Sequence, residues 1–152
     1  MNIQENLKAT GMVKVVHTNA AGEVLNEFEV PNLVVTAGKN HIAAKIAATT
    51  NSPVAMTHMA IGTGSTSAAA GDTTLGTEGG RVALSGSVVS TNTITYTATF
   101  PAGTGTSTSP GVQEAGIFNA SSGGTMLCRT TFPSVAKASG DSIAITWVVT
   151  VS

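Results

Sequence analysis

A stretch rich in glycine and hydroxyl side chains, AIGTGSTSAAAGDTTLGTEGGR at residues 60–81, has the composition of a phosphate-binding loop. Its glycines include Gly62, Gly64, Gly71 and Gly76. A dinucleotide-binding fingerprint would need a third glycine three residues after Gly64, where Ser67 stands, and a P-loop would need a lysine directly before a helix. No lysine lies between Pro53 and Cys128. The sequence therefore predicts no nucleotide site in this stretch.

The same stretch has small side chains that leave its backbone accessible. Loops of this kind often carry the contacts of a protein, because they lie on the surface. We interpret it as a contact loop that orders against a neighbouring subunit, with Ser65, Thr66, Ser67 and Asp72 as the contact residues.

The three histidines, His17, His41 and His58, fall in three different predicted elements. A zinc site would need cysteine, histidine or carboxylate partners at short spacing, and none accompanies them. Asp72 and Asp141 each precede a hydroxyl-rich segment without further acids nearby, which favours turn capping over calcium binding. We expect structural or interface roles for these residues, and no metal or cofactor.

The carboxylates offer little for acid–base catalysis. Paired acids are the catalytic groups of glycosidases, but Glu78 and Glu114 lie far apart in the sequence. We expect them to form structural ion pairs with Arg81 or Arg129, or to accept hydrogen bonds from loop N–H groups. No G-x-S-x-G motif occurs, so the sequence nominates no nucleophile and we expect no enzyme activity.

The single cysteine, Cys128, excludes an internal disulfide and lies among apolar and β-forming residues in TMLCRTTF. A reactive thiol needs an electropositive partner, and the neighbouring Arg129 would point to the opposite face of a strand. We expect Cys128 to be a small buried hydrophobic residue.

Composition narrows the class of protein. The chain has 152 residues, of which only 10% are charged, against about 25% in ordinary soluble domains. Lys and Arg number 7 and Asp and Glu 8, for a net charge of −1. Without a basic patch we expect no nucleic-acid partner, and the low charge suits a protein that works inside an assembly. We also expect no signal peptide, no membrane span and no small-molecule substrate, and synthesis in a cytosol.

Hydrophobic periodicity predicts a mainly β fold. Strands are expected at 12–16, 24–30, 58–61, 81–90, 93–100, 112–119, 125–133 and 142–151, and one helix at 36–49 with Thr36 as its N-cap. The last strand has the strongest alternation, with Trp147 as a core anchor. Many short strands with regular turns indicate a β-sandwich, a jelly roll or a barrel; we expect the β-sandwich or jelly roll, with the one short helix. We expect one domain over residues 11–152 and a flexible N-terminal arm over residues 1–10.

Three segments carry a resemblance to a known class of protein. They are PNLVVTAGKNHIAAKIA, MTHMAIGTGSTSAAAGDTTLGTEGGRVAL and EAGIFNASSGGTMLCRTTFPSVAKASGDSIAITWVVTVS. Together they resemble small virion structural proteins of tailed bacteriophages, and similar segments occur as modules of tail fibre and baseplate proteins. The resemblance covers residues 31–152 and includes the four charged positions Glu78, Arg81, Glu114 and Arg129.

The resemblance implies a β-sandwich or jelly roll without catalytic residues. The size of the chain favours a capsid cement (decoration) protein, an oligomer that binds the major capsid protein on the outer shell after synthesis in the host bacterial cytoplasm. The alternative is a structural protein of the tail, the tail fibre or the baseplate, with receptor binding as a further role there.

Overall fold

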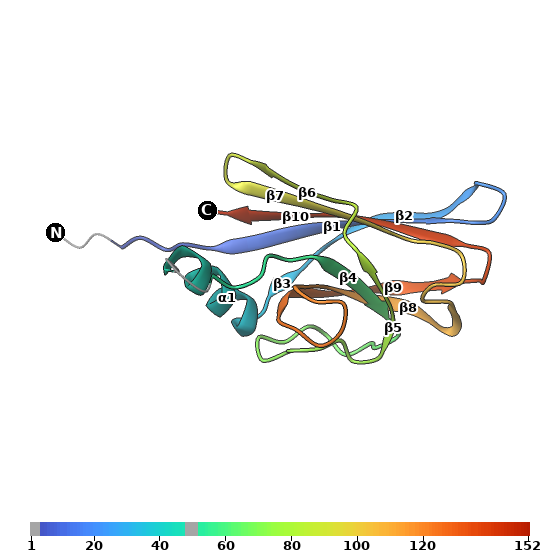
Figure 1. Ribbon diagram of the computed structural model, residues 1–152. Coiled ribbons are helices and arrows are strands. Elements are labelled where there is room, and N and C mark those ends of the chain that lie inside the picture. The colour runs from blue at the N-terminus through green and yellow to red at the C-terminus, as the bar shows by residue number, and fades with distance from the viewer. Residues whose placement is uncertain (1–3, 48–51) are drawn as a thin grey trace.

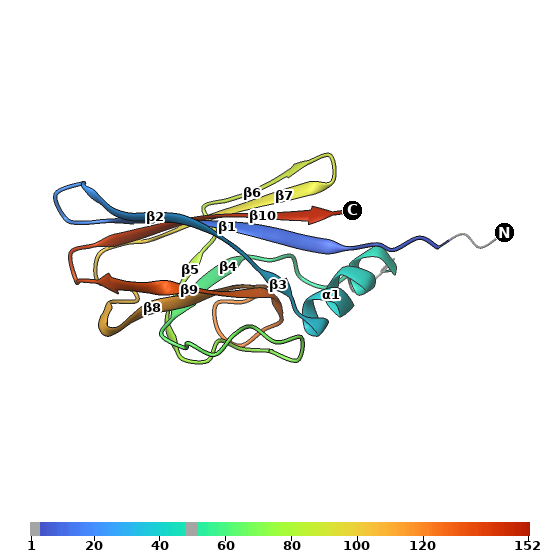
Figure 2. The ribbon, with the colours of Figure 1, turned by 180° about the vertical axis from the view of Figure 1, so that it is seen from behind.

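The computed structural model describes residues 4–47 and 52–152, which form two antiparallel five-stranded sheets and one helix (Figure 1). Sheet A has the strand order β2 (Val24–Pro31), β1 (Ala9–Thr18), β10 (Ser142–Val151), β7 (Thr93–Phe100), β6 (Gly86–Ser90). Sheet B has the order β3 (Leu33–Val34), β9 (Met126–Lys137), β8 (Ser107–Phe118), β4 (His58–Gly62), β5 (Glu78–Ala83). The helix α1 (Thr36–Ala47) lies at one end of the two layers, as both ribbon views show (Figure 2). The predicted all-β sandwich is confirmed.

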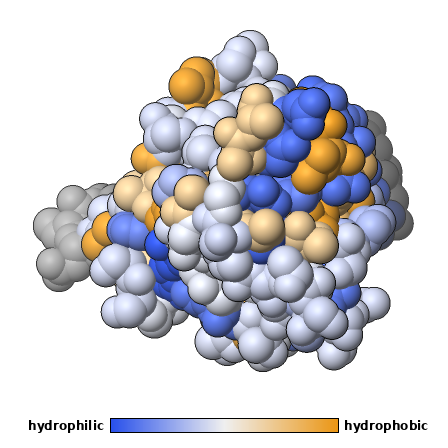
Figure 3. Space-filling model, turned by 90° about the vertical axis from the view of Figure 1, so that its right-hand side faces the viewer, coloured by the Kyte–Doolittle hydropathy of each residue, from blue (hydrophilic) through white to orange (hydrophobic). Residues whose placement is uncertain are grey.

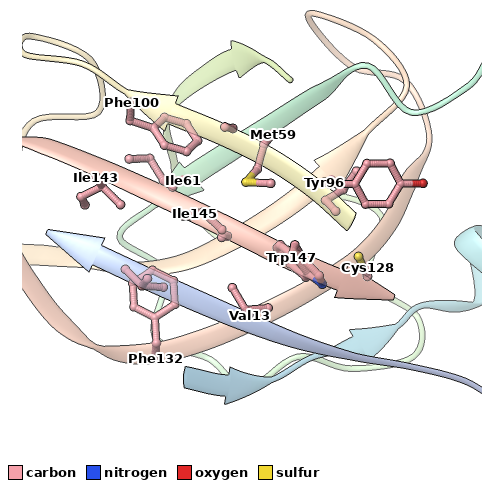
Figure 4. Packing of buried hydrophobic residues seen from close by; sticks show 14 of the residues in the cluster. Val13, Met59, Ile61, Tyr96, Phe100, Cys128, Phe132, Ile143, Ile145 and Trp147 are labelled. Atoms are coloured by element: carbon pink, nitrogen blue, oxygen red, sulfur yellow. The ribbon is translucent and has the colours of Figure 1, made fainter. Parts of the chain in front are cut away.

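The two sheets share one hydrophobic core. Along β10, Ile143, Ile145 and Trp147 point inward and are fully buried, while Ala144 and Thr146 face solvent on the other side of the strand. This alternation follows from the two-residue period of a strand. Figure 4 shows these side chains packed against residues from β1, β4, β7 and β9. Trp147 is the core anchor that the sequence predicted.

The predicted helix is confirmed as α1 over Thr36–Ala47, and residues 48 and 49 of the prediction lie outside the described residues. Its N-terminus differs from the prediction. Thr36 lies inside the first turn, where the carbonyl of Val35 accepts the Lys39 N–H at 3.0 Å. The only buried residue of α1 is Gly38, which packs against the backbone of Leu127. The helix therefore covers the end of the sandwich with little side-chain burial.

Several details of the strands differ from the sequence prediction, and β1, β8 and β9 are each longer than expected. The single strand expected at 81–90 is two strands in different sheets, because the chain leaves sheet B after Ala83 and enters sheet A at Gly86. Leu84 N–H bonds to Thr57 O, and the next N–H, from Ser85, bonds to Thr97 O on β7. Periodicity alone did not predict the two-residue strand β3, since two residues are too short to show a period.

Residues 9 and 10 of the predicted N-terminal arm belong to a strand instead. β1 begins at Ala9, and Lys8 and Ser152 exchange two backbone hydrogen bonds of 2.6 and 2.8 Å. Residues 4–7 are exposed and without regular structure, and residues 1–3 of the predicted arm lie outside the described residues. Among the described residues, no helix combines the length and the apolar character needed to cross a membrane.

The packing of α1 gives a test. A Cβ at Gly38 would lie 2.0 Å from the carbonyl oxygen of Leu127, so Gly38→Ala must displace backbone. We expect it to lower the free energy of unfolding by about 3 kcal/mol, at the upper end of overpacking effects. Gly71→Ala is the matched control, because a Cβ added there would have nothing within 4 Å. Urea unfolding measures both variants, and an equal effect of the two would contradict the close contact of Gly38 with Leu127.

Candidate functional site

The loop that joins β4 to β5, residues 63–77, lies against the outer face of sheet B (Figure 1). Leu75 of this loop is buried in a second, smaller hydrophobic cluster with Val35, Ala60, Phe118 and Met126. The loop therefore forms a partial third layer over sheet B. This is the stretch that the sequence singled out, and we call residues 63–77 the clamped loop because buried charges hold it in place.

The carboxylate of Glu114 on β8 is the centre of this attachment. Its side chain is fully buried and accepts three backbone N–H groups of the clamped loop: Gly64 at 2.8 Å, Gly76 at 2.8 Å and Thr77 at 2.7 Å. Arg129 on the neighbouring strand β9 donates to the same carboxylate through Nε and Nη2, at 3.1 and 2.8 Å. Both ends of the loop are thus tied to one buried carboxylate.

Arg129 ties the middle of the loop to the same centre. Its Nη2 donates to the carbonyl of Thr66 at 2.9 Å, and its Nη1 donates to Asp72 Oδ2 at 2.8 Å. Asp72 also accepts the N–H of Ala69 at 2.9 Å, so it caps a turn as predicted. The guanidinium is almost fully buried, and its planar set of donors suits this arrangement of acceptors.

The electrostatics favour the charged forms of all three groups. Burial by itself would raise the pKa of Glu114, but hydrogen bonds from Thr77, Gly76, Arg129 and Gly64 hold it below its ordinary value. The pKa of Asp72 is lowered by the Ala69 N–H, which with Arg129 outweighs the opposing effect of burial. Burial acts to lower the pKa of Arg129, but its two carboxylate partners raise it overall. Glu114 and Arg129 therefore form an ion pair, and Glu114 also accepts loop N–H groups; both possibilities were named in the sequence analysis.

Glu78 and Arg81 form the other predicted pair. They make two hydrogen bonds, Nε to Oε1 at 2.9 Å and Nη2 to Oε2 at 2.7 Å. Arg81 Nη1 also donates to the carbonyls of Ala120 and Gly123, and the guanidinium lies 3.8 Å from the centre of the Phe118 ring. Arg81 thus fastens the β8–β9 turn to the edge of sheet B, close to the clamped loop.

A third polar cluster lies at the end of the sandwich opposite α1. His17 Nε2 donates to Asp141 at 2.8 Å, while His17 Nδ1 accepts from the amide of Asn26 at 3.0 Å. Asp141 also accepts the Ala138 N–H, and its hydrogen bonds with His17 and Ala138 lower the pKa of Asp141. The predicted turn-capping role of Asp141 is confirmed, and His17 has the predicted structural role.

The sequence prediction missed Lys137 in this cluster. Its side chain is fully buried, and Nζ donates to the carbonyls of Pro101 at 3.0 Å and Asp141 at 2.7 Å. Burial lowers the pKa of Lys137, with the charge of Asp141 opposing this effect. A signal was present, since Lys137 lies two residues after the inward-facing Val135 on the same strand.

The remaining predicted residues lie apart from one another. His58 begins β4 and bonds through Nδ1 to Thr57 Oγ1 at 2.8 Å. His41 lies on α1, where burial and the charge of Lys45 lower its pKa. Cys128 is fully buried, and burial raises the pKa of its thiol, as expected for a structural residue. Ser65, Thr66 and Ser67 are exposed on the clamped loop.

The cavities of the described residues are mainly apolar grooves. Two of them, of about 240 and 260 Å³, flank α1 and share Ile42, Ile46 and Val151 in their linings. The second also contacts Tyr96, whose pKa burial raises to about 12. Within residues 4–47 and 52–152, no three His, Cys, Asp or Glu side chains are grouped so as to hold a metal. A further hollow, of about 400 Å³, lies on the clamped loop and is lined by Thr66, Asp72, Thr73 and Arg129 among others. Because this hollow adjoins the buried charges, we take the surface of the clamped loop as the candidate functional site.

Comparison with known proteins identified no relative of this chain. Searches of protein-family models, curated proteins and solved structures found no match to this chain.

The buried ion pair gives a stability test. Glu114→Gln leaves Arg129 without its fully buried counter-charge, so we expect the free energy of unfolding to fall by about 3 kcal/mol. Glu78→Gln breaks a partly exposed pair and should cost less than about 1 kcal/mol. Chemical denaturation measures both. Equal losses for the two variants would mean that the Glu114 pair contributes no more than a surface pair.

The lowered pKa values of Glu114, Asp72 and Asp141 predict a loss of stability in acid. Each carboxyl takes up a proton less readily in the folded state than in the unfolded chain, so acidification favours unfolding. The loss should begin as the pH falls toward the ordinary values of 4.5 for Glu and 3.8 for Asp, and continue toward the lowered folded-state values. Denaturation midpoints across this range should fall less steeply for Glu114→Gln than for the natural chain. Parallel curves would contradict the assignment to Glu114.

Proposed function

We propose that this chain is a non-enzymatic structural protein of a tailed-phage virion, a capsid cement protein that binds the major capsid protein on the outer shell. Two independent lines support the proposal. The first is the resemblance of residues 31–152 to small phage virion proteins, carried by the motifs around Gly62, Glu78, Arg81, Glu114 and Arg129. The second is the role of those charged residues: Glu114, Arg129 and Arg81 bond to the backbone of loops beside sheet B, and Glu78 bonds to Arg81.

The observation that carries the proposal is the clamped loop. Its residues 65–67, 69–71, 73 and 74 are exposed and all are Ala, Gly, Ser or Thr. The attachment to Glu114 and Arg129 holds this stretch in one shape before it meets a partner. A loop ordered in advance loses little conformational entropy on binding, which raises the affinity of a contact made by small side chains.

The distribution of charge supports a protein partner over a nucleic acid. Arg81, Arg129 and Lys137 have their cationic groups bonded within the fold. The end opposite α1 shows a mixture of hydrophilic and near-neutral residues in which hydrophobic residues form small separate groups (Figure 3). Nucleic-acid binding depends on many free cations that neutralise phosphates, and the chain has only 7 Lys and Arg in total.

Such a protein acts by adding contact area rather than by chemistry. A copy that bridges neighbouring shell subunits binds the assembled shell but not the separated subunits, and it thereby stabilises assembly. A standard specific interface of about 1,600 Å² would suffice for each copy. Where copies are themselves linked, modest single affinities are multiplied through effective concentration.

The proposal predicts the behaviour of particles that lack the protein. We expect such heads to assemble but to lose DNA at a lower temperature than decorated heads, and purified protein should restore their heat survival. Infectivity after heating and electron microscopy of labelled protein measure this. Label at the tail in few copies would instead support the alternative of a tail, tail fibre or baseplate protein. Equal heat survival with and without the protein would overturn the cement role.

The clamped loop can be tested in the same assay. Ser65→Arg and Thr73→Arg add bulk at exposed positions of the loop that make none of its attachments to Glu114 or Arg129. We expect each to weaken binding to stripped heads by about tenfold or more, a loss of roughly 1.4 kcal/mol, because the long charged side chain would prevent close contact of the loop with its partner. Thr99→Arg, exposed on the outer face of sheet A, is the matched control. Unchanged binding by the loop variants would exclude the loop as the contact.

A further inference from the structure

The strand β6 is an edge strand that nothing in the described residues covers. Its sequence, GSVVS, contains no charged residue and no proline. Val88 and Val89 are 63% and 69% exposed although they are consecutive and so face opposite sides of the sheet. An uncharged edge with exposed apolar side chains is a template for pairing with another strand, which stable monomers avoid.

The other three edges each carry a feature that blocks such pairing. On β2, Glu27 and Glu29 would come close to the glutamates of a second copy, and Pro31 has no N–H to donate to a further strand. β3 has only two residues. β5 carries the charged residues Glu78 and Arg81, and charged side chains on an edge strand discourage pairing with another chain. Because the other three edges are protected, the unprotected edge of β6 is an exception, and we infer that it has a function.

The hydrogen-bond pattern shows which groups of β6 face outward. The carbonyl of Thr97 accepts the Ser85 N–H at 2.8 Å and so faces β6. Backbone groups alternate in direction along a strand, and Thr95 therefore also faces β6, where its partner is Val88. The N–H and C=O groups of Ser87 and Val89 then point away from β7. These two residues are free to bond to a further strand.

We propose that β6 pairs antiparallel with β6 of a second copy of this chain, across a two-fold axis at Val88. In this register Ser87 of each copy lies opposite Val89 of the other. The outward N–H and C=O groups of these residues meet in two hydrogen-bonded pairs, so that every free group of this segment is used. Val88 lies opposite Val88 of the second copy, in the closer, non-hydrogen-bonded type of pair. The two sheets A become one continuous sheet.

A second copy fits this edge because the strand is complementary to itself. The two-fold axis places uncharged residues opposite uncharged residues throughout, whereas the same operation on β2 would bring glutamates together. A two-fold contact also closes after two copies, so it gives a dimer and no fibre. This contact does not depend on the proposed role in the virion.

The short strand limits the strength of the contact. Five residues bury less surface than the roughly 1,600 Å² of a standard interface, so we expect a weak dimer in dilute solution. The same contact gains strength where copies are already held side by side on a larger assembly.

Cysteine cross-linking tests the register. Val88→Cys places two thiols opposite each other in the closer type of pair, so a mild oxidant should yield a disulfide-linked dimer. Val89→Cys is the matched control, because its neighbour across the axis is Ser87 and not another cysteine. The natural Cys128 is fully buried and should not contribute. Equal cross-linking of both variants, or of neither, would overturn the proposed register.

Analytical ultracentrifugation tests the edge itself. We expect the natural chain to shift from monomer toward dimer as its concentration rises, and Val88→Lys to weaken this association at least tenfold. Leu25→Lys makes the same kind of change at an exposed position of β2 and should leave it unchanged. Ser87→Pro removes an outward N–H without removing a bond to β7, and should also give a monomer. A natural chain that stays monomeric, or a dimer that survives Val88→Lys, would overturn the proposal.

Discussion

The buried carboxylate of Glu114 holds the clamped loop against the outer face of sheet B. A fully buried carboxylate is tolerated only when its charge is countered and its lone pairs are filled. Arg129 supplies the charge, and three loop N–H groups fill the remaining positions. The loop at residues 63–77 is thereby fixed in one conformation, although its own sequence has few apolar side chains to hold it. The interaction acts between strands β8 and β9 and so depends on the register of sheet B.

This constraint also explains the glycines that first suggested a phosphate site. A Cβ at Gly64 would lie 2.5 Å from Glu114 Oε1, and a Cβ at Gly62 would lie 2.2 Å from the carbonyl of Thr77. The glycines therefore allow the backbone to approach an anion closely, which is the physical role they have in phosphate-binding loops. Here the anion is a side chain of the same protein. The likeness in composition to a phosphate-binding loop therefore has a physical basis in this close approach to an anion.

Local patterns in the sequence were enough to predict the parts of the fold that depend on period. The alternation along residues 142–151 identified β10 and the burial of Trp147, and the pair Glu78–Arg81 followed from a spacing of three residues. What failed depended on contacts between distant segments. The chain crosses from sheet B to sheet A near Gly86, but the residues before and after the crossing have the same strand-like composition. The sequence therefore gives no sign that one strand ends and another begins. The choice of Arg129 as the partner of Glu114 needed the pairing of β8 with β9, which no local pattern encodes.

The small number of charged residues affects both the interior and the surface of the molecule. With 10% charged residues, the chain uses Arg81, Arg129 and Lys137 to fasten loops and turns, and few charges remain to repel neighbouring molecules. Charged side chains protect some edge strands from pairing with other molecules and leave others unprotected, since β2 carries glutamates and β6 carries no charged residue. A free monomer would be exposed to unwanted pairing at such an edge. For a component of an ordered assembly the same edge is a defined point of contact, so the low surface charge and the open strand are consistent with one another.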